Sequence, residues 1–205
     1  MYTLLIASNN PHKIEEINTI FSHYKMNNFR IISIEEAEKE NNLKLDEPIE
    51  DGDTFKENAY IKAAFYKKYF PNFLVASDDT GLMVDSLNGA PGVHSKRYSG
   101  IEGNSELNRK KLLKELEGIN NRNAHFETVV SLIDLNNEVH YFKGEVRGHI
   151  MDHEEVGNGF GYDSLFYCDE LDKPFSKCTT DEKSNVSHRG RAIRALIEYL
   201  KENYE

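Results

Sequence analysis

The stretch Leu74-Val75-Ala76-Ser77-Asp78-Asp79-Thr80-Gly81 joins an apolar segment to two carboxylates and contains the main candidate for a functional site. Three apolar residues predict a buried strand, and the carboxylates and glycine after them predict a turn. Gly81 to Leu87 then predicts a short returning strand. Carboxylates crowded at a strand end repel each other unless a cation or a donor is near. The pair therefore indicates either a Mg²⁺ site, since this ion prefers oxygen ligands, or an acidic turn that closes a hairpin.

The chain before this stretch predicts strands and helices in alternation. Tyr2 to Ala7 is apolar enough for a buried strand, and the polar cluster from Ser8 to Pro11 follows it as a turn. Thr54 and Glu57 match a capping box, with Thr54 as the N-cap of a helix. Other predicted elements here are a helix after Pro11 with Ile14, Ile17, Phe21 and Tyr24 on one face, a strand at 30–34, and a helix from Thr54 to about Phe70. The acidic segment 35–53 shows no clear periodicity.

The chain after this stretch predicts a hairpin between two helices. Residues 126–135 and 139–150 resemble strands, and Asn136-Asn137 between them favours a turn. A helix is predicted before the hairpin at 106–116, and a glycine-rich loop follows it at 157–162. Ser187 is a plausible N-cap for a last helix with one apolar stripe, formed by Ile193, Leu196, Ile197 and Leu200. The whole pattern predicts an α/β fold in which helices pack on a mixed sheet.

The composition is that of a globular protein with an acidic surface. The chain has 205 residues, of which 39% are hydrophobic, and its formal net charge of -10 disfavours a nucleic-acid scaffold. A small anionic substrate would need a local cationic pocket or a bound metal ion. The two cysteines, Cys168 and Cys178, form no CxxC motif, and no apolar run is long enough to span a membrane. We therefore expect a soluble protein of the cytoplasm.

The segment from Ser8 to Lys13 is a candidate phosphate site. It lies between a predicted strand and helix, where backbone N–H groups and the Lys13 ammonium could meet an anion. The alternative is a capped helix with a solvated lysine. No G-x-x-x-x-G-K-[ST] pattern occurs, which excludes a P-loop.

Two further candidates lie near the C-terminal end. Lys183 with His188-Arg189 gathers cationic donors near the last helix, although cations are unfavourable at a helix N-terminus. In the loop 157–163, Phe160 or Tyr162 could stack on a base. The alternatives are a solvated helix end and a plain connecting loop. Glu50 alone resembles a surface carboxylate, and histidines such as His23 and His125 are interpreted as structural or surface residues.

In order along the chain, these segments resemble the inosine triphosphate pyrophosphatase family. Ala7 to Lys13 is similar to its A-[TS]-x-N-x-x-K segment, and Thr54 to Ala59 to its T-F-x-E-N-A helix start. Ser77 to Val93 resembles its A-D-D-[ST]-G-L-x-V-D-x-L-x-G-A-P-G stretch. Gly159 to Asp163, and Glu182-Lys183 with Ser187 to Gly190, complete the match. The resemblance covers nearly the whole chain.

The resemblance implies a Mg²⁺-dependent enzyme that hydrolyses non-standard purine nucleoside triphosphates (ITP, dITP and XTP) to the monophosphate and pyrophosphate. It implies an inosine triphosphatase-like domain over 1–205, with an elongated twisted mixed sheet and two lobes around a cleft, and a homodimer. Asp79 would be the catalytic base and a metal ligand, with Glu50 as a second metal ligand. Substrate would be bound by Ser8, Asn9, Asn10, Pro11, His12, Lys13, Thr80, Phe160, Gly161, Tyr162, Asp163, Lys183, His188 and Arg189.

Three other functions stay open. Related folds act on pyrimidine or modified nucleoside triphosphates, so the substrate class is the first alternative. A nucleotide-binding regulatory protein without turnover is the second, and the intact Asp78-Asp79 pair with both lysines argues against it. A nucleic-acid-binding module is the third, and the acidic net charge disfavours it.

Overall fold

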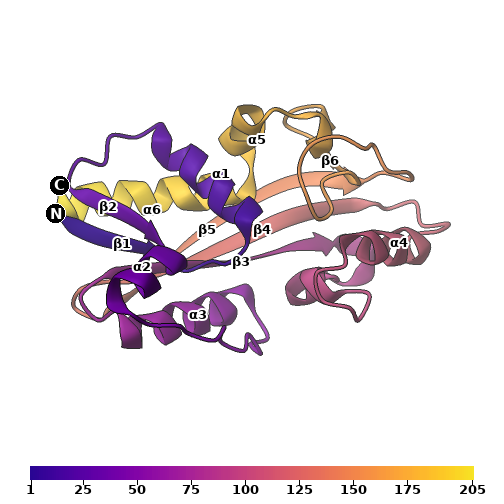
Figure 1. The fold of residues 1–205 in the computed structure, drawn as a ribbon. Coiled ribbons are helices and arrows are strands. Elements are labelled where there is room, and N and C mark those ends of the chain that lie inside the picture. Colours follow the sequence, from indigo (N-terminus) through magenta and orange to yellow (C-terminus); the bar gives the residue numbers. More distant parts are fainter. The chain divides into compact units, whose positions relative to one another are not determined.

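The protein is an α/β chain whose seven strands form one mixed sheet, which confirms the predicted fold class. A computed structural model describes all 205 residues (Figure 1). The strand order is β2-β1-β3-β4-β5-β6-β7. β1 pairs parallel with β2 and with β3, whereas β6 pairs antiparallel with β5 and with β7. The strands are β1 (Tyr2–Ile6), β2 (Phe29–Ser33), β3 (Leu74–Val84), β4 (Asn123–Ile133), β5 (Val139–Ile150), β6 (Phe166–Cys168) and β7 (Lys173–Pro174).

Most helices begin at side-chain caps that the sequence encodes locally. Thr54 and Glu57 form the predicted capping box, and Ser33 with Glu36 forms another. The α-helices are α1 (Pro11–Ser22), α2 (Ile34–Asn41), α3 (Phe55–Tyr69), α4 (Ser105–Glu115), α5 (Thr180–Val186) and α6 (His188–Tyr204). Short 3-10 helices span Asp85–Leu87, Gly92–Arg97 and Phe175–Lys177. None of the helices is both long and apolar enough to cross a membrane.

The turn predicted at Asp78-Asp79 is wrong. β3 runs without interruption for 11 residues, from Leu74 to Val84, through both carboxylates and Gly81. Successive side chains of a strand point to opposite faces, so the two carboxylates do not crowd each other. Each has a partner on its own face, Lys13 for Asp78 and Asn58 for Asp79, so repulsion does not force the chain to turn.

Two compact units divide the chain, and both are discontinuous in sequence. Unit 1 comprises Met1–Asp79, Val129–Lys143 and Ala192–Glu205, and unit 2 comprises Thr80–Thr128 and Gly144–Arg191. The boundary in β3 falls between Asp79 and Thr80, so Asp78 and Asp79 belong to unit 1 and Thr80 belongs to unit 2. The candidate site residues are divided in the same way. Residues 8–13, Glu50 and Asp79 lie in unit 1, and Thr80, 160–163, Lys183, His188 and Arg189 lie in unit 2.

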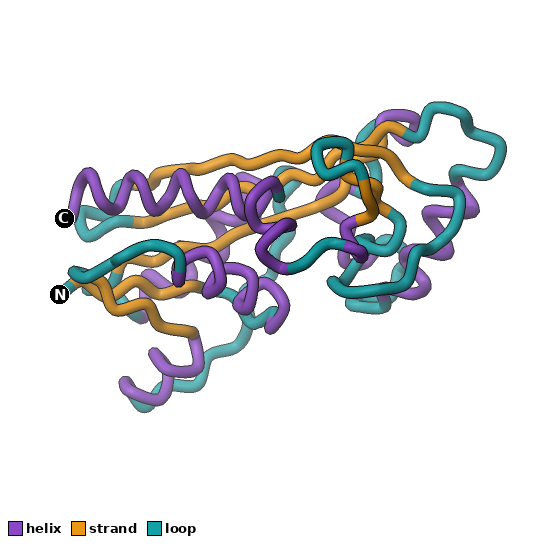
Figure 2. The backbone as a smooth tube through the Cα atoms, turned by 90° about the horizontal axis from the view of Figure 1, so that it is seen from above, coloured by secondary structure: helices purple, strands orange, loops and turns teal.

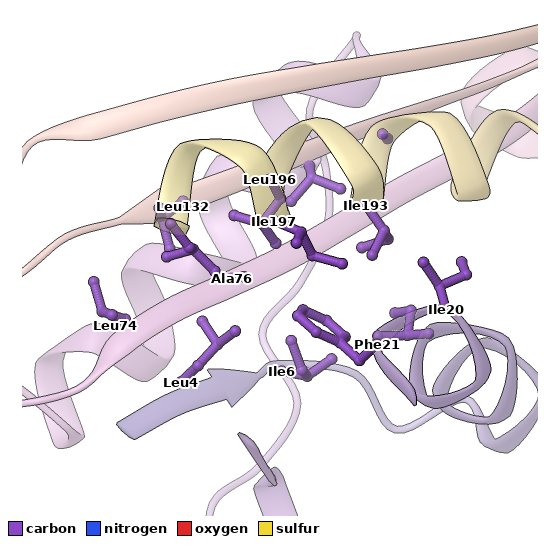
Figure 3. Packing of buried hydrophobic residues seen from close by; sticks show 14 of the residues in the cluster. Leu4, Ile6, Ile20, Phe21, Leu74, Ala76, Leu132, Ile193, Leu196 and Ile197 are labelled. Atoms are coloured by element: carbon purple, nitrogen blue, oxygen red, sulfur yellow. The ribbon is translucent and has the colours of Figure 1, made fainter. Parts of the chain in front are cut away.

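Unit 1 has apolar packing on both faces of its part of the sheet. α1 and α6 cover one face and α3 covers the other (Figure 1). The predicted stripe of α6 is buried, with Leu196, Ile197 and Leu200 at 0% exposure. These residues pack with Leu4, Ala76 and Leu132 of three neighbouring strands (Figure 3). Each fully buried leucine or isoleucine stabilises the fold by about 1.5–3 kcal/mol, so the α6 stripe is a main source of stability.

Both chain ends belong to unit 1 and lie side by side (Figure 2). The Tyr2 and Tyr204 rings are 4.9 Å apart between centroids and meet edge to face. Phe29 joins this contact, with its ring 6.2 Å from Tyr204. Such pairs contribute about 0.5–1.5 kcal/mol beyond their area, so they hold the end of α6 against β1 and β2.

Unit 2 has an aromatic core under its strands. Phe126, Phe166 and Phe175 pack together, with centroid distances of 4.7 Å and 5.0 Å for the pairs that Phe166 makes. Cys168 and Cys178 are buried free thiols in the same cluster. Burial raises the pKa of Cys178 to about 11, so it stays a neutral thiol at physiological pH.

The predicted hairpin at Asn136-Asn137 is confirmed, and Asp134 organises it. The buried Asp134 Oδ1 accepts hydrogen bonds from the amides of Asn136 (2.8 Å) and Glu138 (2.9 Å). Its Oδ2 lies 3.1 Å from His140 Nε2. Burial opposes the ionisation of Asp134, but these hydrogen bonds outweigh it and hold the pKa of Asp134 below its usual value.

Replacing Asp134 by Ala is expected to lower the free energy of unfolding at pH 7 by roughly 1–3 kcal/mol, because several hydrogen bonds to the carboxylate are lost. Asp134→Asn keeps an acceptor for the two amides, so it serves as the milder control. A carboxyl whose pKa is lower in the folded than in the unfolded protein stabilises the fold at pH values above the unfolded-state pKa. The difference in the free energy of unfolding between wild type and Asp134→Ala should therefore narrow as the pH falls below about 3.9. Urea unfolding at several pH values measures it. Equal stability of wild type and Asp134→Ala at pH 7 would contradict the role.

Candidate functional site

The N-terminus of α1 carries Lys13 and is capped by Asn10. Asn10 Oδ1 accepts hydrogen bonds from the amides of His12 (3.0 Å) and Lys13 (3.3 Å), and Ser8 Oγ accepts one from the Asn10 amide (3.2 Å). Pro11, at the first helical position, has no N–H group. Two amides that the sequence offers to an anion are thus occupied by Asn10. The Lys13 ammonium is left as the main cationic group of this turn.

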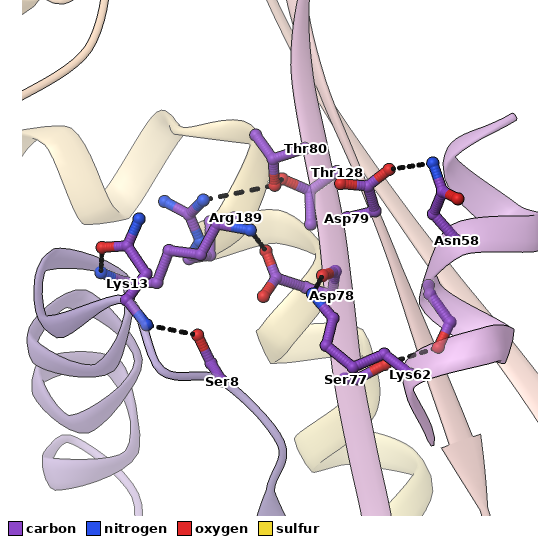
Figure 4. Close-up of polar contacts among 12 residues, drawn as sticks. Ser8, Lys13, Asn58, Lys62, Ser77, Asp78, Asp79, Thr80, Thr128 and Arg189 are labelled. Atoms are coloured by element: carbon purple, nitrogen blue, oxygen red, sulfur yellow. Dashed lines mark hydrogen bonds and ion pairs between the residues drawn. The ribbon is translucent and has the colours of Figure 1, made fainter. Parts of the chain in front are cut away.

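Lys13 contacts the first aspartate of β3. Its Nζ lies 3.0 Å from Asp78 Oδ2, and the Asp78 side chain is only 2% exposed (Figure 4). Breaking a buried ion pair by removing one partner costs several kcal/mol, so this contact ties α1 to β3. The Lys13 ammonium has three N–H donors and no acceptor.

Asp79 points to the opposite face of β3, toward α3. Asn58 Nδ2 donates to Asp79 Oδ2 at 3.1 Å, and Asn58 Oδ1 accepts from the Gly52 amide at 2.8 Å (Figure 4). Asn58 is 2% exposed, so both of its hydrogen bonds are shielded from water. A Cβ on Gly52 would come within 2.8 Å of Asn58 Oδ1, which only glycine avoids. Asn58 therefore connects the acidic segment before α3 to the Asp79 carboxylate.

Asp79 has both acidic and basic neighbours, and these shift the pKa of its carboxyl in opposite directions. Burial raises the pKa of the Asp79 carboxyl above its usual value, and Glu50 raises it further. Lys13 and Lys62 oppose this rise without cancelling it. A carboxylate that is buried and close to a second carboxylate is stabilised by a cation, and it is also more basic than usual.

Lys62 links this cluster to Glu50. Its Nζ donates to the Asp78 carbonyl oxygen at 3.0 Å and lies 2.9 Å from Glu50 Oε1. Burial alone would lower the pKa of Lys62, but Asp78, Glu50 and Asp79 outweigh it and raise that pKa. Lys62 is therefore a cation at neutral pH and lies among three acidic residues.

Sequence reasoning missed Lys62 and Asn58 as members of this site. Both lie on α3 four residues apart, so they share one helix face. The capping box at Thr54 fixes where α3 begins, and with it which residues point toward β3. The four-residue spacing of Asn58 and Lys62 placed them on one face of α3, but the sequence did not show that β3 lies against this face.

The carboxylates of this cluster fit a Mg²⁺ ion. Mg²⁺ takes hard oxygen ligands, usually one or two carboxylates with substrate phosphates. Asp79 and Glu50 are close enough for Glu50 to raise the pKa of Asp79. A dication beside them would relieve this repulsion.

Unit 2 has its own polar group at the next residue of β3. Thr80 Oγ1 lies 2.8 Å from Thr128 Oγ1 and accepts a hydrogen bond from Arg189 Nη2 at 3.2 Å (Figure 4). Arg189 is 1% exposed although it lies in the first turn of α6. The alternative of a solvated helix end is therefore excluded for Arg189.

Lys183 is also buried, and it lies in the separate helix α5. Its Nζ lies 2.8 Å from Asp163 Oδ2 and 5.0 Å from the Phe160 ring centroid. Asp163 Oδ2 also accepts from the Phe160 amide at 3.1 Å, which closes the glycine loop. Gly159 has φ +89°, and a Cβ there would lie 2.3 Å from Asp163 Oδ2, so the loop needs glycine at this position.

The remaining residues that were predicted to bind substrate differ in their exposure and in their contacts. His188 stacks on Phe126 at 4.7 Å between centroids and is 3% exposed. Tyr162 is buried and donates its hydroxyl to the Ser95 carbonyl oxygen at 2.7 Å, which occupies its polar end. The Gly161 carbonyl oxygen accepts from Arg109 Nη1. In unit 1, Asn9 is exposed and donates to Glu47, and Pro11 and His12 are exposed.

A mixed sheet that carries acidic oxygen ligands beside lysines, together with buried cations at a glycine loop, is typical of α/β proteins that handle phosphorylated ligands. The chain belongs to the Ham1 family, whose model matches residues 4–199. This confirms the family resemblance of the sequence motifs.

Similar proteins cover almost the full chain. The dITP/XTP pyrophosphatase of Thermoanaerobacter sp. (strain X514) is 42% identical over 98% of each chain. The dITP/XTP pyrophosphatase of Caldanaerobacter subterraneus is 40% identical over 100% of this chain and 99% of its own. The solved Ham1 protein of Staphylococcus aureus has a TM-score of 0.84 and 38% identity, with 98% of each chain covered. The fold and the family thus agree.

Proposed function

We propose that this chain is a nucleoside-triphosphate pyrophosphatase that hydrolyses non-standard purine nucleotides (ITP, dITP and XTP) to the monophosphate and pyrophosphate. One observation carries the proposal. Asp79 and Glu50 provide two carboxylates beside the ammonium groups of Lys13 and Lys62, in a chain about 40% identical to dITP/XTP pyrophosphatases. Carboxylates for a metal and ammonium groups for phosphate oxygens are what hydrolysis of an anhydride bond needs.

The candidate residues of unit 1 and those of unit 2 have different roles in this proposal. Ser8, Asn10 and Lys13 bind the triphosphate, with contributions from Lys62. Phe160, Lys183 and Arg189 bind the base and nearby phosphate. Asp79 and Thr80, one from each group, are consecutive residues of β3. The predicted single domain with two lobes around a cleft is part of this proposal.

The reaction breaks the bond between the α-phosphorus and the oxygen that bridges it to the β-phosphate. The oxygen of a water molecule bonds to the α-phosphorus, and pyrophosphate leaves with the bridging oxygen. Asp79 accepts the proton of this water. Lys13 and Lys62 stabilise the negative charge that develops on the phosphate oxygens.

Asp79 and Glu50 would hold a Mg²⁺ ion. The chemistry that it supplies when bound is neutralisation of charge on the phosphate oxygens. Asn58 keeps the Asp79 carboxylate in place through its hydrogen bond to Oδ2. Lys62 does the same for Glu50 through their ion pair.

Selectivity follows from the donors in unit 2. Lys183 and Arg189 are buried cations that can donate but not accept. A 6-oxo purine presents an acceptor to such donors, whereas the 6-amino group of ATP presents a donor. The mismatch leaves buried groups unsatisfied at roughly 1–3 kcal/mol each, and one such group gives about fivefold to 150-fold discrimination.

A substrate panel tests the proposal. The protein is incubated with Mg²⁺ and with ITP, dITP, XTP, ATP, GTP and dTTP separately, and pyrophosphate and orthophosphate are both assayed. We expect pyrophosphate from ITP, dITP and XTP, with kcat/KM at least about fivefold above that for ATP. Orthophosphate as the only product, or no turnover, would exclude the proposed reaction. A preference for dTTP would favour the pyrimidine or modified nucleotides instead.

The homodimer implied by the sequence resemblance also belongs to this proposal. Its support is the membership of the Ham1 family alone. Multi-angle light scattering on the purified protein gives the molar mass directly, and the mass of a single chain would contradict a dimer.

A further inference from the structure

The glycine loop of unit 2 is contacted by an arginine that the proposed reaction does not use. The loop 159–163 includes Phe160, which is proposed to bind the base. Arg109, in the second turn of α4, reaches this loop with its guanidinium group. Both residues belong to unit 2, so the contact is internal to that unit. The sequence patterns did not identify Arg109 as a candidate.

Arg109 makes two contacts that fix its orientation. Nη1 donates to the Gly161 carbonyl oxygen at 2.9 Å, and Nε pairs with the Glu154 carboxylate. The Arg109 side chain is 20% exposed and that of Glu154 is 34% exposed. A guanidinium is a rigid planar fork, so the carboxylate that holds Nε also determines where the other donors point. Glu154 therefore directs Arg109 at the Gly161 peptide.

Gly161 is the residue of the loop whose backbone most needs such a contact. Its φ is +60°, and a Cβ there would meet nothing within 4 Å, so neither sterics nor a side chain fixes its conformation. Its neighbours have contacts of their own. Asp163 Oδ2 accepts from the Phe160 amide at 3.1 Å, and the Tyr162 hydroxyl donates to a backbone carbonyl oxygen at 2.7 Å. The direction of the Gly161 carbonyl then sets how Phe160 lies relative to Tyr162, and Arg109 holds that direction.

The position of Phe160 matters because its ring lies beside the cations that are proposed to recognise the base. The ring centroid is 5.0 Å from Lys183 Nζ and 6.0 Å from Arg189 Cζ. A base that stacks on this ring would therefore meet those donors. α4 is itself held in place, because the neighbouring Asn108 is 3% exposed and donates to the Lys96 carbonyl oxygen at 3.0 Å.

We propose that Arg109 is a positioning residue for base recognition. Its contact with Gly161 holds the glycine loop so that Phe160 stacks on the purine. This inference rests on the proposed function, since it takes a purine nucleotide as the ligand. Arg109 acts through the loop and contacts neither base nor phosphate. It therefore sets the affinity for the nucleoside part of the substrate, and phosphate binding and the hydrolytic step do not depend on it.

The test compares two ligands in wild type and in Arg109→Met. One is the α,β-methylene analogue of ITP, in which the bond to be broken cannot be hydrolysed, and the other is inorganic tripolyphosphate, which has no base. Calorimetry with Mg²⁺ present should give a Kd for the analogue that is at least about fivefold higher in the variant, the low end of what stacking contributes, and a Kd for tripolyphosphate within about twofold of wild type. KM for ITP should rise as the Kd of the analogue does, while kcat stays nearly constant.

Lys110→Met is the matched control. Lys110 is the next residue of α4, is 66% exposed and pairs with Glu106 of the same helix, so its replacement also removes an ion pair. This variant should bind both ligands as wild type does. Weaker binding of both ligands by Arg109→Met would make Arg109 a general support of the fold. Unchanged binding of the analogue would remove it from base recognition. Either result overturns the inference.

A double variant tests whether Arg109 acts through the loop. Gly161→Ala should also weaken binding of the analogue, and because both changes affect one peptide, their effects should not multiply in the double variant. Effects that multiply would overturn the inference. Should Arg109→Met fold poorly by circular dichroism, Arg109→Lys replaces it, since a lysine keeps the charge but not the fork that contacts Gly161 and Glu154 together. Wild-type affinity for the analogue in that variant would overturn the inference as well. A wild-type protein that neither binds the analogue nor hydrolyses ITP would instead refute the proposed function.

Discussion

Replacing Asp79 by Asn is expected to lower kcat for pyrophosphate release from ITP by about 10³-fold or more while the fold stays intact. The loss has two sources. A positioned general base contributes roughly 10²–10⁴-fold, and an amide is no base. The neutral side chain is also a poorer ligand for a dication, so the Mg²⁺ concentration for half-maximal activity should rise.

The free energy of unfolding of Asp79→Asn is not expected to fall with kcat. Burial raises the pKa of Asp79, so at pH 7 its ionised form costs the folded state free energy when no metal is bound. An amide removes that cost and can still accept the hydrogen bond from Asn58. In the presence of a chelator, Asp79→Asn should therefore be as stable as wild type or more stable.

Stopped assays for pyrophosphate and urea unfolding measure both effects. Asp169→Asn removes the same charge from a side chain that is 60% exposed, and it should leave kcat and stability unchanged. Turnover within tenfold of wild type would remove Asp79 from the base role. A large loss of stability would show that the inactive variant is merely unfolded.

Replacing Lys13 by Met is expected to harm both binding and folding. The ammonium holds triphosphate in the proposed reaction, so KM for ITP should rise at least about tenfold, the effect of losing one charged hydrogen bond of 1.5–3 kcal/mol. The variant also leaves the carboxylate of Asp78, which is 2% exposed, without its contact at 3.0 Å. Removing one partner of a buried pair costs roughly 3–5 kcal/mol, so the free energy of unfolding should fall by about that amount.

A double replacement separates these two roles of Lys13. Lys13→Met with Asp78→Asn removes both charges, so no carboxylate is left buried beside a missing cation. We expect most of the lost stability to return, whereas KM stays high because the phosphate contact is still missing. Recovery of KM in the double variant would show that Lys13 acts only as the partner of Asp78.

Local patterns predicted much of the fold. The capping box at Thr54, the apolar stripe of α6 and the hairpin at Asn136-Asn137 each depend on neighbouring residues, and the structure confirms all three. α2 was missed, although Ser33 and Glu36 form a capping box, because its eight residues are mostly charged and show little apolar periodicity. Local capping was the better signal there than hydrophobic spacing.

The predicted turn at Asp78-Asp79 was wrong because its partners are distant in sequence. Lys13 and Asn58 are 65 and 21 residues from the aspartates that they contact, as the differences 78 − 13 and 79 − 58 show. A sequence pattern gives the charge of a residue but not its neighbours across the sheet. For the same reason the roles of Lys62 and Thr128 were not predicted, although the aspartates and Lys13 were identified as candidates.

The unbroken course of β3 limits how this protein can tolerate changes in length. Side chains of a strand alternate between faces, so inserting one residue after Ala76 would turn the first aspartate toward α3 and the second toward α1. We therefore expect insertions and deletions among descendants of this gene to spare β3 and to gather in the segment 42–49 and in the surface loops.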